Sequence, residues 1–177
     1  MKLYTSYWAQ VRNFPRNLVG LNTTVWPPRW RPMGKDKNGV LVIDCPPLKP
    51  GAECSDLCNG PDDCRYNESH NCLFLRTYYH QLKQIEFDHF IYQLQKLHDD
   101  ICTGENLEDV DFAIIVFEKY DSPCSERWSI KKWFKEHNIE VQEWQLDNNQ
   151  SQQNRVLWML LKKHMKMKLP VLFNGKM

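Results

Sequence analysis

The stretch FAIIVFEKYDSPCSERWSIKKWFKEHNIEVQEW, residues 112–144, decides the fold class. Its first part, 112–117, is continuously apolar, which is typical of a strand buried on both faces of a sheet. Its last part, 139–144, alternates between apolar and polar residues as a half-buried strand does. A helical pattern separates the two runs, so the stretch predicts a β-α-β unit with parallel strands and a right-handed crossover.

The loop between the first strand and the helix carries the residues of greatest chemical interest. Ser122 is the expected N-cap and Pro123 fits the first helical position, which places Cys124 and Ser125 in the first helical turn. Free backbone N–H groups there favour an anion or a thiolate. Arg127 follows Cys124 by three residues, and its planar guanidinium group can bind a phosphate or a carboxylate with two hydrogen bonds. The alternative is a purely structural role, in which Cys124 is a small buried residue and Arg127 forms an ion pair that stabilises the fold.

Working outward from this unit, the periodicity of the chain predicts further strands and helices. The expected strands are 2–6, 17–22, 40–44 and 169–173, and the expected helices are 7–13, 73–85, 87–101 and 150–167. Strands that alternate with helices in this way form α/β proteins. We therefore predict a single Rossmann-like α/β domain over 1–177, with a small, largely parallel sheet flanked by helices.

Residues 45–72 form a cysteine-rich insert within this domain. Proline and glycine exclude a long helix or a central strand from much of it, and so long a loop requires another source of order. The predicted metal ligands are four cysteines of the insert: Cys54, Cys58, Cys64 and Cys72. His70 or Cys45 could replace one of these four ligands. Four thiolates suit structural zinc, and an iron–sulfur cluster is the alternative.

Composition and charge limit the remaining choices. The chain has 177 residues, a net charge of +1 and seven cysteines. We find no apolar run long enough to span a membrane and no apolar leader after Met1, so we expect a cytoplasmic protein with reduced thiols. Basic residues dominate 1–37 and 151–177. If these ends meet, they form a face for an anion or a nucleic acid; otherwise they are solvated surfaces.

The segment 26–32, WPPRWRP, places indole rings beside guanidinium groups. Such a segment can stack on a base and hold its phosphate, or it can be a rigid loop that covers the edge of the sheet. If strand 2–6 is parallel to 112–117, its end reaches the crevice that contains Cys124. The predicted pocket then consists of Ser6, Tyr7, Arg29, Trp30, Glu118, Cys124, Ser125 and Arg127.

Residues 112–144 resemble the DUF488 family, whose members carry an apolar strand, a Glu, a loop with Cys and Arg, and then a helix and a strand. The opening YTSYWAQVR of 4–12 looks like the opening of the family, and 74–85 resembles its central helix. Many members have Cys-His-Arg where this chain has Cys-Ser-Glu-Arg at 124–127, so the obvious general base is missing. The family occurs widely in bacteria and their phages, and its activity is largely undefined. The resemblance therefore implies a fold and a site location.

Two functions are consistent with these patterns. The first is the binding of an anionic small molecule, a nucleotide or nucleobase-like compound, with or without turnover. Any turnover would use Cys124, Arg127 and Glu118 as the reactive groups. The alternative is a zinc-containing module that binds nucleic acid or protein through its basic termini, including a phage-type inhibitor of a host factor.

Overall fold

The computed structural model describes residues 1–30, 33–54, 57 and 72–145 of the chain. Met1–Trp144 forms one compact unit, whereas a second unit, Gln145–Met177, lies outside the described residues except for Gln145. The expected helix 150–167 and strand 169–173 fall in that second unit. The single domain over 1–177 therefore stays a prediction.

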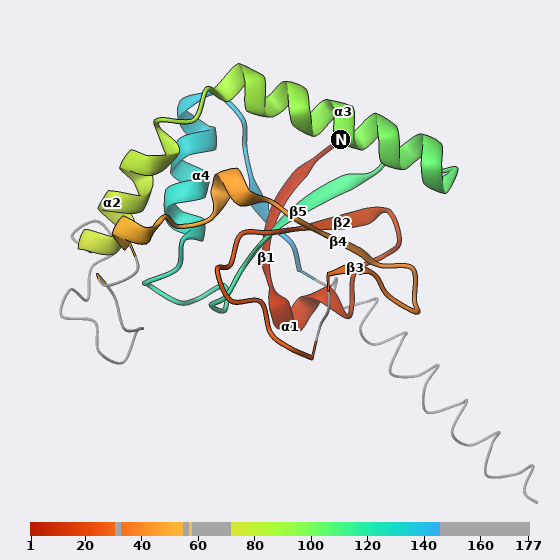
Figure 1. The fold of residues 1–177 in the computed structure, drawn as a ribbon, viewed down its shortest axis with the longest axis horizontal. Coiled ribbons are helices and arrows are strands. Elements are labelled where there is room, and N and C mark those ends of the chain that lie inside the picture. Colours follow the sequence, from red (N-terminus) through yellow and green to blue (C-terminus); the bar gives the residue numbers. More distant parts are fainter. Residues whose placement is uncertain (31–32, 55–56, 58–71, 146–177) are drawn as a thin grey trace, which may run out of the picture. The chain divides into compact units, whose positions relative to one another are not determined.

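A six-stranded, mostly parallel sheet forms the centre of the first unit (Figure 1), in the order β3-β4-β2-β5-β1-β6. Five of these strands are mutually parallel, and β3 pairs antiparallel with β4 at one edge. The strands are β1 (Leu3–Tyr7), β2 (Leu18–Asn22), β3 (Gly34–Lys35), β4 (Leu41–Asp44), β5 (Asp111–Val116) and β6 (Gln142–Glu143). The prediction of an α/β fold with a largely parallel sheet is confirmed.

The apolar run in β5 occupies the middle of the sheet because both of its faces are covered. Phe112, Ile114 and Val116 point into one core, whereas Ala113 and Ile115 point into a second core on the opposite face. All five side chains are fully buried. This alternation is the physical reason for the uninterrupted hydrophobic sequence of the strand.

Helices cover the two faces unequally. The larger core lies under α2 (Leu73–Leu82), α3 (Phe87–Glu105) and α4 (Arg127–Glu136), and α1 (Trp8–Val11) packs on the other face (Figure 1). Two short 3-10 turns, η1 (Pro46–Leu48) and η2 (Ala52–Cys54), come after β4. None of the helices in the described part of the chain has the length and apolar content needed to cross a membrane.

The start of α4 differs from the sequence-based expectation. The helix begins at Arg127 with Glu126 as its N-cap, so the prediction that Ser122 caps it and that Cys124 and Ser125 lie in its first turn is wrong. Residues 119–126 form turns instead, with the Ser122 N–H donating to the carbonyl of Lys119. The Ser125 hydroxyl accepts from the backbone N–H and Nε of Arg127, which fixes the first helical residue without a cap at Ser122.

The order of the strands creates a switch point between β2 and β5. These two strands are neighbours, but the chain leaves β2 toward β4 on one side and leaves β5 toward β6 on the other. Their connections therefore diverge at the carboxyl edge of the sheet. In open α/β sheets such a divergence opens the crevice that binds ligands.

Gly20 is required at the centre of β2, where the α1 side of the sheet is tightly packed. A Cβ at this position would lie 2.5 Å from Cδ1 of Ile115 and 3.1 Å from Cγ2 of Val42. We expect Gly20→Ala to lower the free energy of unfolding by about 1–3 kcal/mol through overpacking. Urea unfolding measures the change.

Gly104→Ala is the matched control, since nothing lies within 4 Å of a Cβ built there in α3. This substitution should raise the free energy of unfolding by about 0.5–1 kcal/mol, because alanine favours a helix over glycine. Equal effects of the two substitutions would contradict the packing explanation.

Candidate ligand pocket at the carboxyl edge

A pocket of about 610 Å³ opens at the carboxyl edge of the sheet, at the switch point between β2 and β5. Its walls come from the segments after β2 and β5, from η2 and from α2. The described residues that line it are Thr24, Val25, Trp26, Pro50, Gly51, Ala52, Cys54, Phe74, Phe117 and Glu126. The volume lies within the range of ordinary small-molecule sites.

A hydrogen-bonded chain fixes the segment after β2. The Asn22 amide donates to Asp44 over 2.7 Å, and its carbonyl oxygen accepts from both the backbone N–H and the hydroxyl of Thr24. The indole N–H of Trp8 donates to the Thr24 hydroxyl over 3.1 Å. These contacts tie β2, β4 and α1 together, so the Thr24 wall of the pocket is held before any ligand arrives.

Aromatic rings dominate the mouth of the pocket. Trp26 is 83% exposed and Phe117 is 62% exposed, and Phe74 contributes a third ring from α2. Large aromatic side chains that remain exposed beside a cavity are suited to stacking against a flat ligand.

Glu126 supplies a carboxyl group to this lining although only 9% of the residue is exposed. Burial raises the pKa of Glu126 well above its usual value, and the charge of Glu118 and a hydrogen bond with it raise this pKa further. The neighbouring Arg127 opposes the shift only weakly. Burial and the nearby Glu118 therefore both favour the protonated form of Glu126.

The Cys54 thiol lines the same pocket from η2. Burial raises its pKa, and the charge of Glu53 adds to the effect. Its Sγ lies 3.8 Å from Oε1 of Gln81, a side chain that also bonds the backbone of Gly51 and Lys49. Without a bound metal ion, the raised pKa disfavours a nucleophilic thiolate in this position.

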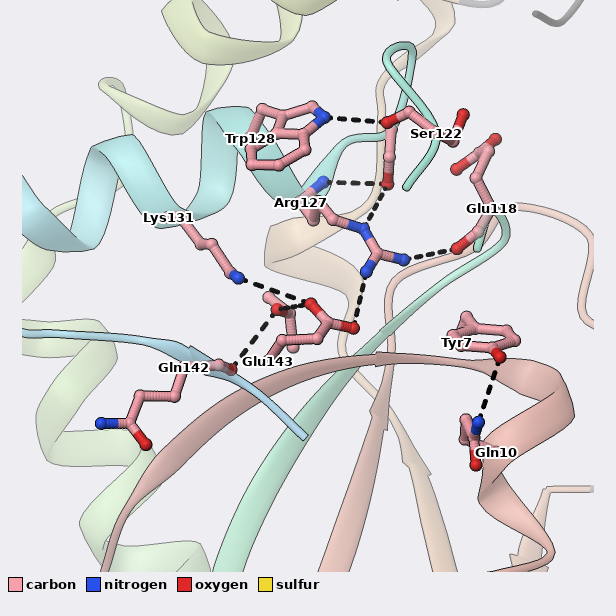
Figure 2. A network of polar contacts seen from close by, with 11 residues as sticks. Tyr7, Gln10, Glu118, Ser122, Arg127, Trp128, Lys131, Gln142 and Glu143 are labelled. Atoms are coloured by element: carbon pink, nitrogen blue, oxygen red, sulfur yellow. Dashed lines mark hydrogen bonds and ion pairs between the residues drawn. The ribbon is translucent and has the colours of Figure 1, made fainter. Parts of the chain in front are cut away.

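Arg127 is enclosed by protein (Figure 2). Its side chain is 0% exposed, with Nη1 2.6 Å from Oε1 of Glu143 and Nε 3.0 Å from the hydroxyl of Ser125. Its Nη2 donates to the backbone carbonyl of Glu118. The guanidinium group thus joins α4, the loop after β5 and the edge strand β6, and the structure corresponds to the ion-pair alternative for this residue.

Glu143 completes this network on the side of β6. Its second carboxylate oxygen accepts from the Thr5 hydroxyl over 2.6 Å and lies 3.4 Å from Nζ of Lys131 (Figure 2). Thr5 and Glu143 are also register partners in the parallel pairing of β1 with β6. A two-residue strand is thereby anchored by side chains as well as by its backbone.

The structure brings some of the predicted site residues together and separates others. Glu118, Ser125 and Arg127 share one network, and buried Cys124 lies in the same loop. The predicted pocket required the first strand to run parallel to 112–117, and β1 does pair in parallel with β5, with Tyr7 opposite Val116. Ser6 is buried, the Tyr7 hydroxyl accepts from Gln10, and Arg29 and Trp30 are exposed. None of these residues is among the described residues that line the pocket.

The sequence patterns did not indicate Thr24 and Glu126, and they favoured Trp30 where the lining contains Trp26. Trp26 lies in the same aromatic segment, 26–32, and Glu126 lies in the same loop as Cys124. The strand order would have identified these residues, because the pocket forms where the connections after β2 and β5 diverge.

The predicted metal ligands are described only in part. Cys54 and Cys72 are buried on either side of 58–71, whereas Cys58, Cys64 and His70 lie outside the described residues. Within the described ranges, no group of three or more His, Cys, Asp or Glu side chains is arranged to hold a metal ion. The zinc site, with the iron–sulfur alternative, stays a prediction. Cys45, the substitute ligand, lines a separate apolar pocket between η1 and α3.

Comparisons of this chain with protein-family models, with curated proteins and with solved structures return no match. The resemblance of 112–144 to the DUF488 family therefore stays a prediction, and the function must be inferred from the geometry of the chain itself.

The Arg127 network gives a testable effect on stability. Arg127→Leu should lower the free energy of unfolding by about 3–5 kcal/mol, because it leaves the carboxylate of Glu143 without its buried partner. Chemical unfolding of the purified variant measures this loss.

Lys131→Met is the matched control, since Lys131 contacts the same carboxylate from a partly exposed position. It should cost no more than about 1 kcal/mol. Equal losses in the two variants would show that burial of the guanidinium group does not decide the effect.

Proposed function

We propose that this protein binds a small molecule with a nucleobase-like ring in the pocket between β2 and β5, within a Rossmann-like α/β domain. The observation that carries the proposal is the combination of exposed aromatic rings with a buried polar carboxyl group at the switch point of the sheet. The rings provide stacking surfaces, and Thr24 and Glu126 provide hydrogen-bonding groups for the edge of a heterocycle.

The positions of the basic side chains change the sequence-based expectation of an anionic ligand. Arg127 donates to three protein groups and is fully buried. The described lining of the pocket contains no Lys or Arg. The ring of the ligand is therefore the part that the pocket accommodates best. For a nucleotide, Arg29, exposed in the same loop as Trp26, is the group that we assign to the phosphate.

The proposal is one of binding, and it includes no reaction. The described lining offers the carboxyl group of Glu126 and the thiol of Cys54, both with raised pKa values, and it contains no His that could act as a general base. The alternative of a nucleic-acid or protein-binding module draws on the basic residues of both ends, 1–37 and 151–177, and 151–177 lies outside the described residues.

A direct test uses purified protein and a panel of free nucleobases, nucleosides and nucleotides, measured by titration calorimetry. Trp26→Ala should weaken the binding of any member that binds by about tenfold or more, since stacking on one ring contributes about 1–3 kcal/mol. Trp30→Ala is the matched control, because Trp30 is also exposed but does not line the described pocket. An equal loss in the two variants, or no binding by any member of the panel, would refute the proposed pocket.

We further propose that Cys54, Cys58, Cys64 and Cys72 hold a structural zinc ion in the insert 45–72. Elemental analysis of the purified protein should then find about one zinc per chain. Cys64→Ser should lose the metal and lower the unfolding temperature, because metal binding contributes to folding. Cys102→Ser, in α3, should retain it. Iron with sulfide would identify the alternative cluster, and a metal-free protein would refute both sites.

A further inference from the structure

Two aromatic rings of the pocket between β2 and β5 have faces that no other ring of the described chain covers. Trp26 follows β2 and Phe117 follows β5, and both side chains are largely exposed. Neither ring takes part in a ring–ring contact within the described ranges, whereas Phe74 stacks on Tyr78 with their ring centres 6.2 Å apart. The faces of Trp26 and Phe117 are therefore open to a ligand.

The cations of the described chain also leave these two rings uncovered. Nζ of Lys132 lies 4.2 Å from the ring centre of Tyr79, and Nζ of Lys83 lies 5.9 Å from the same ring centre. No Lys or Arg among the described residues lies over Trp26 or Phe117. The face of an aromatic ring is its negative part, so these two faces can attract a positive charge that the ligand brings.

The described lining of the pocket has no positively charged side chain. It contains no Lys, Arg or His, and its ionisable groups are the Glu126 carboxyl group and the Cys54 thiol. A carboxyl group is either neutral or negative, and so is a cysteine, whether it is a free thiol or a thiolate on the proposed zinc ion. The charge that the lining presents to a ligand is therefore zero or negative in every protonation state.

The nearest basic residues along the chain do not change this balance. Arg127 is fully buried, and the carboxylate of Glu143 compensates its charge. Arg29 is exposed in the same loop as Trp26, but it is not among the described residues that line the pocket. A phosphate held by Arg29 would thus lie outside the pocket, and the ring of the ligand would contact only neutral or negative groups.

We propose that the pocket prefers a flat heterocycle that carries a positive charge, such as a base methylated on a ring nitrogen, over the neutral form of the same ring. This inference rests on the proposed function and names the ligand class of the same site. A cationic ring against Trp26 and Phe117 gains a cation–π attraction in addition to stacking, whereas a neutral ring gains stacking alone. An anionic ring would meet the negative ring faces without a cation in the described lining.

Two isomers of one nucleoside test the charge preference by titration calorimetry. N1-methyladenosine is cationic in slightly acidic solution, whereas N6-methyladenosine carries its methyl group on the exocyclic nitrogen and is neutral. The cation should bind at least about fivefold more tightly, because two partly exposed rings each add a cation–π attraction. Nicotinamide and its ring-N-methylated cation provide a second pair, in which the charge of the cation does not depend on pH. Equal or weaker binding of both cations would overturn the inference.

Substitutions of the rings test where the preference arises. Trp26→Leu and Phe117→Leu keep an apolar side chain but remove the aromatic face, so each should lower the affinity ratio of the two isomers by about twofold or more. Trp30→Leu and Tyr120→Leu are the matched controls, since these rings are exposed in the same two loops but do not line the described pocket. A ratio that persists in both pocket variants, or that falls equally in the controls, would overturn the inference.

Tetramethylammonium and salt separate this site from simpler cation binding. Tetramethylammonium has a positive charge but no flat ring, so it should bind at least about tenfold more weakly than the methylated nicotinamide cation. Equal binding of these two cations would overturn the assignment of a ring. Added salt should leave the affinity ratio of the isomers nearly unchanged, because salt screens distant surface charges more than a direct contact with a ring. A ratio that disappears in salt would also overturn the inference.

The outcomes separate this inference from the proposed function. Equal binding of charged and neutral rings, with a loss in Trp26→Ala, would overturn the charge preference and leave the proposed pocket in place. Binding of the cationic rings alone would support both proposals. No binding by any heterocycle, charged or neutral, would refute the proposed function and this inference with it.

Discussion

The buried guanidinium group of Arg127 is the interaction on which the carboxyl edge of this sheet depends. A charge that is fully removed from water is stable only when its donors are satisfied, and here they join Glu143, Ser125 and the backbone of Glu118. These partners come from β6, from the loop after β5 and from that loop's junction with α4. One side chain therefore sets the position of a short edge strand, the start of a helix and the turn that faces the ligand pocket.

Because Arg127 is bound by protein groups, its guanidinium group does not serve as the anion-binding group of the loop. An exposed arginine at a helix start would favour an anion, but a buried arginine with protein partners leaves that role to other groups. The adjacent residue, Glu126, lines the pocket, and burial and the nearby Glu118 raise the pKa of its carboxyl group. Consecutive residues thus serve opposite purposes: one holds the architecture together, and the other gives the pocket its polarity.

The sequence predicts much of the fold because local patterns decide it. The apolar run in β5, the helical spacing in α2, α3 and α4, and the short strands β1, β2 and β4 all arise from residue periodicity. The start of α4 was predicted wrongly because Ser122 and Pro123 satisfy a local capping rule that tertiary contacts of Ser125 and Arg127 override. The pocket was not predicted because it depends on which strands are neighbours. Nothing in the local pattern of β2 indicates that it pairs with β5.

The loop after β5 contributes both to the Arg127 network and to the pocket, so few substitutions there affect binding without also affecting stability. The backbone carbonyl of Glu118 accepts from Arg127, so the arginine network holds the loop that also carries Glu126 into the pocket lining. A substitution that removes Arg127 would disturb both the edge strand and the pocket, and loss of binding in such a variant would say little about the ligand. Isosteric changes at Glu126 leave the backbone contacts of this loop intact. They therefore separate the contribution of the Glu126 carboxyl group to binding from the contribution of the architecture that holds it.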